Sequence, residues 1–179
     1  MKALIITSKL VQDHEFIYPF YRLKEEGIEV HVSNLSDMQV DGFFGTKIPP
    51  QKEDIIVNLK NIKVDDYDLL ILPGGVKSME ILRLDKNSVE IVKIFNSKDK
   101  IIAAICSGVM MLISADILRS RKVTGYYAWK QDFINAGGIF VDSPTVIDGN
   151  LITSPHYKYN GEWMRNVINL LKSKNKLHN

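Results

Sequence analysis

Three stretches of this sequence are apolar almost throughout, and each is only about as long as a β-strand. They are KALIITS at 2–8, YDLLILPGG at 67–75 and KIIAAIC at 100–106. A strand without alternating polar positions is typical of a parallel sheet that is covered on both faces. Segments with helical spacing lie between these runs. We therefore predict an α/β fold with a mostly parallel sheet and helices on both faces.

The remaining segments continue this alternation of strands and helices. Apolar periodicity predicts helices at 15–27, 78–96, 107–118, 128–138 and 161–174, and strands at 28–34 and 122–127. Asp148-Gly149 between two β-like runs predicts a hairpin over 145–154. We expect Pro19 within about the first turn of its helix. Residues 40–61, with two short β-like runs around Pro49-Pro50, predict a small antiparallel excursion.

Length, charge and cysteine count limit the class of the protein and its partners. The 179 residues suit one domain that spans 1–179. A formal net charge of +2 is too small to favour nucleic acid or an acidic membrane. No apolar run approaches the ~20 residues that cross a bilayer. One cysteine cannot form an internal disulfide, so a reducing cytoplasm is the expected location.

The sequence carries no pattern for a cofactor. It has no GxGxxG or P-loop motif, which argues against a nucleotide. Its four histidines and single cysteine lack metal-ligand spacing. We therefore expect no cofactor and no metal, and a small molecule as the substrate.

The single cysteine, Cys106, ends a buried run and precedes a predicted helix. Ser107 and Gly108 are small enough to allow a sharp strand-to-helix turn that exposes the thiol, as in a nucleophile elbow. A helix N-terminus beside the thiol predicts a pKa below the ~8.5 of a free thiol. The glycines of the Pro-Gly-Gly turn, Gly74 and Gly75, could bring backbone N–H groups to a developing anion. The alternative is a small buried hydrophobic residue, which most lone cysteines are.

Taken together, these segments resemble the ThiJ/PfpI family over nearly the whole chain. The resemblance runs through KALIITS, EFIYPFYRLKEEGIEV, YDLLILPGG, IIAAICSG, ISADIL, KVTGYY, INAGG, VIDGNLITS and EWMRNVINLL. It implies a doubly wound, flavodoxin-like fold that forms homodimers or larger homo-oligomers. It also implies that Cys106 is the elbow nucleophile and that Glu15, from the first loop, is its protonated hydrogen-bond partner. The backbone groups of the family's site fall on Gly74 and Gly75.

The chain departs from the family at the positions where a base would stand. PfpI-like members have a histidine directly after the cysteine, where this chain has Ser107, and a second acid where it has Gln12. Deglycase-like members have a histidine where the best match is Tyr126. His156, in the loop after a strand, matches a histidine near the PfpI-like site, and an exposed loop residue is the equal alternative. Without a visible base, peptide hydrolysis is not expected.

Three functions stay open on the sequence. The first is an enzyme in which Cys106 attacks a reactive carbonyl or a glycated adduct, Glu15 moves the proton, and N–H groups near Gly74, Gly75 and Ser107 hold the anion. The second is a redox or stress-response protein whose Cys106 oxidises to a sulfinic acid. The third is a diverged small-molecule enzyme adapted through Ser107 and Tyr126.

Overall fold

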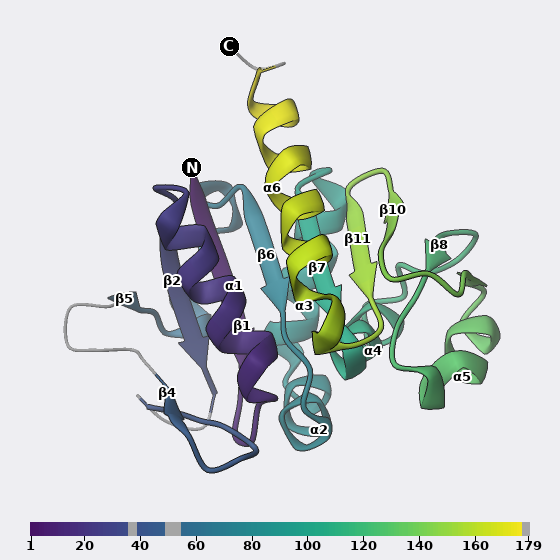
Figure 1. Ribbon diagram of the computed structural model, residues 1–179, viewed down its shortest axis with the longest axis horizontal. Coiled ribbons are helices and arrows are strands. Elements are labelled where there is room, and N and C mark those ends of the chain that lie inside the picture. Colours follow the sequence, from purple (N-terminus) through teal and green to yellow (C-terminus); the bar gives the residue numbers. More distant parts are fainter. Residues whose placement is uncertain (36–38, 49–54, 177–179) are drawn as a thin grey trace.

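A seven-stranded sheet organises the part of the chain that the structure describes, residues 1–35, 39–48 and 55–176 of a computed structural model (Figure 1). The strand order is β10-β11-β7-β6-β1-β2-β5, and every neighbouring pair is parallel except β10 and β11. The strands are β1 (Lys2–Thr7), β2 (Glu29–Asn34), β5 (Ile55–Ile56), β6 (Leu69–Leu72), β7 (Ile101–Ile105), β10 (Val146–Asp148) and β11 (Leu151–Ser154). The predicted mostly parallel α/β fold is therefore confirmed.

The continuous apolar runs form the three central strands, because both faces of the sheet are covered. Leu4 and Ile6 of β1 pack with α2 (Val76–Leu84), α3 (Lys86–Ser97) and α4 (Met110–Ser114). Ala3 and Ile5 face α1 (Asp13–Glu25) and α6 (Asn160–Lys176), which lie side by side in front of the sheet in Figure 1. Each fully buried Leu or Ile side chain stabilises the fold by about 1.5–3 kcal/mol. The two layers hold the strand ends in fixed positions.

Helix α1 begins two residues earlier than predicted. Gln12 caps it, because its side-chain oxygen accepts the N–H groups of His14 at 2.7 Å and Glu15 at 3.3 Å. The left-handed Gly27 (φ 72°) follows its C-terminal end. Pro19 lies in the second turn rather than the first, so this prediction is wrong. Because proline has no backbone N–H, the helix loses one hydrogen bond at Pro19. The packing of the helix on the sheet offsets this loss.

The single helix predicted at 78–96 is two helices in the structure. Asp85 ends α2 in an extended conformation and caps α3, where its carboxylate accepts the Ser88 N–H at 2.7 Å. The helix predicted at 107–118 is also shorter: a 3-10 turn, Cys106–Val109, leads into the five residues of α4. The left-handed Asp116 (φ 54°) follows, which stops the helix before residue 118.

The excursion after β2 is antiparallel in part. β3 (Val40–Asp41) pairs with β4 (Lys47–Ile48) in antiparallel fashion, as predicted, whereas β5 joins the main sheet parallel to β2. Pro49 and Pro50 lie outside the described residues. The strand predicted at 122–127 shrinks to β8 (Lys122–Val123), which pairs with β9 (Ile139–Phe140), and α5 (Lys130–Asn135) lies between them.

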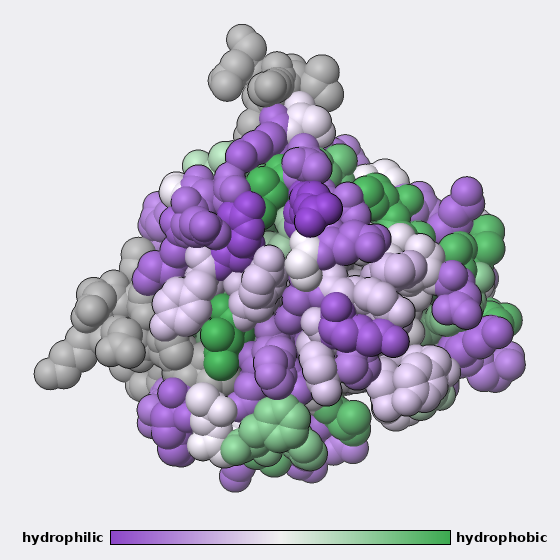
Figure 2. All heavy atoms as spheres, viewed as in Figure 1, coloured by the Kyte–Doolittle hydropathy of each residue, from purple (hydrophilic) through white to green (hydrophobic). Residues whose placement is uncertain are grey.

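The last two strands form a hairpin at one edge of the sheet. β10 and β11 pair antiparallel around Gly149 (φ 57°), which confirms the prediction. On the face that Figure 2 shows, hydrophilic residues dominate and hydrophobic ones form separate patches. None of the helices within the described ranges has both the length and the apolar character to cross a bilayer.

Candidate functional site

A cavity of about 500 Å³ lies beyond the carboxyl ends of β1, β6 and β7. From β1 the chain continues to β2 on one side of β1, and β6 is then added on its other side. The order in which strands are added therefore reverses between β1 and β6. Such switch points are where open α/β sheets bind ligands. Seven of the eight residues predicted for the site line this cavity: Gln12, Glu15, Gly75, Cys106, Ser107, Tyr126 and His156. The eighth, Gly74, lies against Glu15 and Cys106.

Cys106 occupies the sharp turn that the sequence predicts. Its φ is 57°, a left-handed conformation that is rare for a residue with a side chain. Such strain costs about 1–3 kcal/mol and is found mostly at functional sites. Gly108 permits the turn, because a Cβ at that position would approach the carbonyl oxygen of Leu72 to 2.2 Å. The packing of the turn on β6 therefore requires a glycine.

Glu15 reaches the cysteine from the first turn of α1. Its side chain is fully buried, and Oε2 accepts the backbone N–H of Gly74 at 2.9 Å. Burial raises the pKa of the Glu15 carboxyl to about 7, although contacts with Cys106 and with the Gly74 N–H act in the opposite direction. The Gly74 N–H thus serves the carboxylate. The donor that was predicted for a developing anion therefore contacts Glu15 in this structure.

The thiol of Cys106 differs from the sequence prediction in its acidity. Burial raises its pKa above the ordinary value, and the negative charge of Glu15 raises it further. The Ser107 N–H lowers the pKa, but it does not offset these effects. The expected helix N-terminus is a four-residue 3-10 turn before a short helix, so its dipole is weak. The predicted fall in thiol pKa is therefore wrong, chiefly because the thiol is buried.

Glu15 and Cys106 consequently titrate as a pair. Two negative charges cannot lie close together in a buried corner without a large penalty. The carboxyl with a pKa of about 7 and the thiol with a raised pKa therefore retain at least one proton between them at neutral pH. A shared proton of this kind can move from sulfur to carboxylate when the sulfur attacks an electrophile.

His156 lies on the cavity wall, and a backbone hydrogen bond to its ring determines which nitrogen carries the proton. The Lys158 N–H donates to His156 Nδ1 at 3.2 Å, so Nδ1 is an acceptor and the proton of the neutral ring is on Nε2. Partial burial lowers the pKa of the imidazole, and the charge of Lys158 lowers it further. The ring lies parallel to that of Tyr126 at 6.4 Å between centroids. His156 can therefore offer a hydrogen-bond donor at neutral pH.

Aromatic side chains that the sequence did not indicate form the mouth of the cavity. Phe43 and Phe44 come from the loop between β3 and β4, are 63% and 60% exposed, and contact each other edge to face at 5.6 Å. Tyr157 stacks on His14 at 4.9 Å and lies 4.0 Å from His156, ring to ring. The only signal for the phenylalanines was two adjacent aromatic residues between glycines. Val76, Lys77 and Glu80 of α2 complete the wall.

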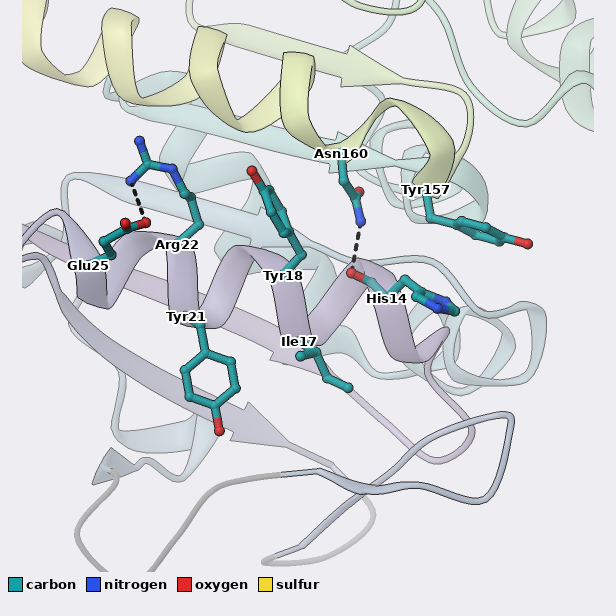
Figure 3. Close-up of a pocket in the computed structure, with 8 residues that line it drawn as sticks. All are labelled: His14, Ile17, Tyr18, Tyr21, Arg22, Glu25, Tyr157 and Asn160. Atoms are coloured by element: carbon teal, nitrogen blue, oxygen red, sulfur yellow. Dashed lines mark hydrogen bonds and ion pairs between the residues drawn. The ribbon is translucent and has the colours of Figure 1, made fainter.

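A second hollow, of about 600 Å³, runs along α1 (Figure 3). Tyr18 projects from one turn of the helix, and Tyr21 and Arg22 project from the next. Asn160 of α6 donates to the His14 carbonyl at 2.9 Å. Tyr157 lines both this hollow and the cysteine cavity. Cys106 lines the cavity and does not line this hollow.

No group of histidine, cysteine and carboxylate side chains in the described ranges has the arrangement of a metal site. The cavity presents a thiol, a carboxyl that titrates near neutrality, an imidazole donor and a buried hydroxyl.

The sequence matches the profile of the DJ-1/PfpI family over residues 1–170. It is 38% identical to the Deglycase PfpI of Pyrococcus furiosus over 172 residues, covering 96% of this chain and 100% of that protein. It is 40% identical to the Deglycase PH1704 of Pyrococcus horikoshii over 174 residues, with the same coverage. The chain belongs to the DJ-1/PfpI family. This confirms the family that the sequence motifs indicated.

Solved structures agree with this family assignment. A two-domain protein of Anabaena variabilis, with a DJ-1/ThiJ/PfpI-like and a ferritin-like domain, superposes with a TM-score of 0.88 at 31% identity. The match covers 96% of the present chain and spans half of that longer protein. The doubly wound, flavodoxin-like architecture is thus that of the DJ-1/PfpI family.

Proposed function

We propose that this protein is a cysteine-dependent enzyme that acts on small reactive carbonyls or glycated adducts, in a glyoxalase or deglycase type of reaction. The observation that carries the proposal is the buried pairing of Glu15 with Cys106 beside an open cavity. A carboxyl with a pKa of about 7 both accepts and returns a proton at neutral pH. The relatives named deglycases support an enzyme of this kind.

The reaction begins with the transfer of the thiol proton to Glu15. The sulfur attacks the carbonyl carbon, a C–S bond forms, and the electrons of the C=O bond move to oxygen, which takes the proton back. The product is a hemithioacetal. For a 2-oxoaldehyde, Glu15 next moves the proton on the former aldehyde carbon to the adjacent carbon, while the hydroxyl proton passes to the adjacent oxygen, so that a thioester of the 2-hydroxy acid forms. Water then adds to the thioester carbonyl, the C–S bond breaks, the acid leaves, and the sulfur takes back a proton as the free thiol. The sum is the addition of one water to the dicarbonyl.

The developing oxyanion needs donors other than Gly74. Gly75 and Ser107 both line the cavity, and their backbone N–H groups are the proposed donors. His156 Nε2 offers a third from the opposite wall. Gln12 and Tyr126 are proposed to shape the pocket around the substrate. A cavity of about 500 Å³ suits a small molecule.

Peptide-bond hydrolysis is not part of the proposal. A leaving amine needs a proton from an acid, and the nucleophile needs a base. His156 Nδ1 already accepts the Lys158 N–H, and Nε2 carries its proton, so neither nitrogen is free to act as the base. We expect a casein or fluorogenic-peptide assay to show no cleavage above that of Cys106→Ala.

The direct test is methylglyoxal consumption by the purified protein, in a buffer free of amines and added thiols. We expect the wild type to consume the dicarbonyl and to form the 2-hydroxy acid, while Cys106→Ala remains at the buffer rate. Glu15→Gln keeps a hydrogen-bond donor but cannot move a proton, so it should lose about 10²–10⁴-fold in rate. Equal rates for wild type and Cys106→Ala would remove the proposal.

A redox role is the second candidate, supported by a thiol that is open to the cavity beside a carboxyl able to hydrogen-bond an oxidised sulfur. Mass spectrometry after limited peroxide treatment tests it, with two oxygen atoms added at Cys106 as the expected product. Retained dicarbonyl activity in fully oxidised protein would contradict the enzyme proposal. The homodimer or larger homo-oligomer and the cytoplasmic location remain predictions from the sequence.

A further inference from the structure

Two buried polar atoms at the thiol have no hydrogen-bond partner among the described residues. They are Glu15 Oε1 and Ser107 Oγ, and both residues line the cysteine cavity. Ser107 is only 1% exposed, so ordinary solvent contact does not satisfy its hydroxyl. Buried polar groups are nearly always hydrogen-bonded, and an exception needs a reason. A hydroxyl held without a partner beside a nucleophile is available to a ligand.

The position of this hydroxyl is defined by its neighbours. A Cβ built on Gly74 would meet Glu15 Oε2 at 2.3 Å, Cys106 Cβ at 2.9 Å and Ser107 Oγ at 3.1 Å. The Glu15 carboxyl, the Cys106 Cβ and the Ser107 hydroxyl therefore all lie around the same small space next to Gly74. The hydroxyl also favours the thiolate, because it lowers the pKa of Cys106. The unpartnered hydroxyl therefore lies beside the Cys106 side chain, where it can turn toward a negative charge that forms there.

We propose that the Ser107 hydroxyl donates a hydrogen bond to the negative charge at the reactive centre, first on Cys106 Sγ and then on the oxygen of the attacked carbonyl. The second half of this assignment rests on the proposed function, whereas the first half does not. Ser107 keeps its own proton throughout. The proton that neutralises the oxygen is the thiol proton moved by Glu15, so no other reactant is needed.

A serine at this position has a consequence for pH dependence. A hydroxyl does not titrate near neutrality, so its hydrogen bond persists across the range in which Glu15 changes charge. The other titratable groups that line the cavity come from three parts of the described chain: Glu15 from α1, Lys77 and Glu80 from α2, and Tyr126, His156 and Tyr157 from the loops after β8 and β11. Ser107 therefore shifts the pH dependence of thiol reactivity without adding a titration step.

The decisive experiment is the rate of iodoacetamide alkylation of Cys106 against pH, in wild type, Ser107→Ala and Ser107→Thr. Ser107→Ala should move the midpoint upward by about 0.5–1 pH unit, since a donor to the thiolate is lost. Ser107→Thr keeps the hydroxyl and should stay close to wild type. Ser114→Ala, in the adjacent helix α4 and bonded to Arg83 instead, is the matched control. Thermal unfolding verifies that each variant is folded.

Methylglyoxal kinetics supply the second measurement. Ser107→Ala should lower kcat by about 10- to 100-fold with KM changed less than about twofold, and Ser107→Thr should restore most of the rate. An unchanged alkylation midpoint in Ser107→Ala overturns the assignment, even if kcat falls, because packing alone would then explain the loss. If the wild type consumes no methylglyoxal, the proposed function fails, while a shifted midpoint still supports the Ser107 donor.

Discussion

The backbone N–H of Gly74 and the carboxylate of Glu15 are joined by a buried hydrogen bond of 2.9 Å, at a point that solvent does not reach. One such donor stabilises the carboxylate but does not replace the water that burial removes, which is why the pKa of Glu15 rises to about 7. Nothing in the sequence around Glu15 marks its carboxyl as unusual, but the fold buries it completely. This burial makes the free energy of unfolding of the protein depend on pH.

Glu15 should make the wild type less stable as pH rises from about 4.5 to 8. The folded protein holds this proton up to a pKa of about 7, whereas the unfolded chain releases it near 4.5. The folded state therefore binds more protons in this interval, and the free energy of unfolding falls by about 3 kcal/mol as pH rises through it. Urea unfolding of wild type and Glu15→Gln at several pH values measures this.

The difference between the two proteins isolates the one carboxyl. The free energy of unfolding of Glu15→Gln minus that of wild type should grow by about 3 kcal/mol between pH 4.5 and pH 8. Glu90→Gln, which removes an exposed carboxylate, is the control and should show no such trend. Parallel stability curves for wild type and Glu15→Gln would show that burial does not perturb Glu15.

Gly108→Ala should unfold or strongly destabilise the protein. Its Cβ would lie 2.2 Å from the Leu72 carbonyl oxygen and 2.9 Å from that of Pro73, both backbone atoms of a central strand and its turn. Because neither can move without displacing β6, we expect a loss of at least about 3 kcal/mol. Gly161→Ala, whose Cβ would have only Tyr18 Oη at 4.0 Å, should change stability by less than about 1 kcal/mol. Chemical unfolding compares the two.

The sequence predicted the sheet because its central strands are buried on both faces, and this burial leaves a direct trace in runs such as 100–106. It also placed Cys106 and Pro-Gly-Gly at one edge, since parallel strands end there. The positions of Glu15 and His156 came only from the family resemblance. Helix lengths were less visible. Asp85 both ends α2 and caps α3, and only the short polar run DKNS at 85–88 marks that junction in the sequence.

The electrostatics of the site could not be predicted from sequence. The direction of the thiol pKa depends on how far Cys106 is buried and on where the Glu15 carboxyl points, and both follow from tertiary packing. Likewise, the Gly74 N–H is consumed by a residue distant in sequence. The aromatic mouth comes from the excursion between β3 and β4, whose position over the cavity no periodicity could indicate.

His156 should be neutral at pH 7, with its proton on Nε2. The Lys158 N–H occupies Nδ1, and a proton at Nδ1 would place two donors against each other. Long-range ¹H–¹⁵N spectra distinguish the two nitrogens directly. With methylglyoxal, His156→Ala should lower kcat/KM by about tenfold, and His156→Gln, which retains a donor, should lose less. A protonated Nδ1 in the neutral ring would contradict the donor role and reopen that of a base.

Phe43 and Phe44 should determine how large a carbonyl substrate the enzyme accepts. Both rings remain more than half exposed while lining the cavity, so an apolar substituent on a substrate would bury them further. The loop that carries them is held in place, because Asp13 Oδ2 accepts the Phe44 N–H at 2.9 Å and the Phe44 ring packs edge-on against His14 at 5.7 Å. The rings thus form a fixed wall.

The comparison that tests this wall uses two dicarbonyls that share a reacting group and differ only in size. Phe43→Ala and Phe44→Ala should each lower kcat/KM for phenylglyoxal by about tenfold, since an aromatic contact is worth about 0.5–1.5 kcal/mol beyond its buried area. For methylglyoxal, whose single methyl group offers the rings little apolar surface, the change should stay within about twofold. Tyr21→Ala, on the hollow of Figure 3 and away from the thiol, is the control for surface aromatic loss. Equal losses with both dicarbonyls would mean that the phenylalanines support the fold of the site and do not select its substrate.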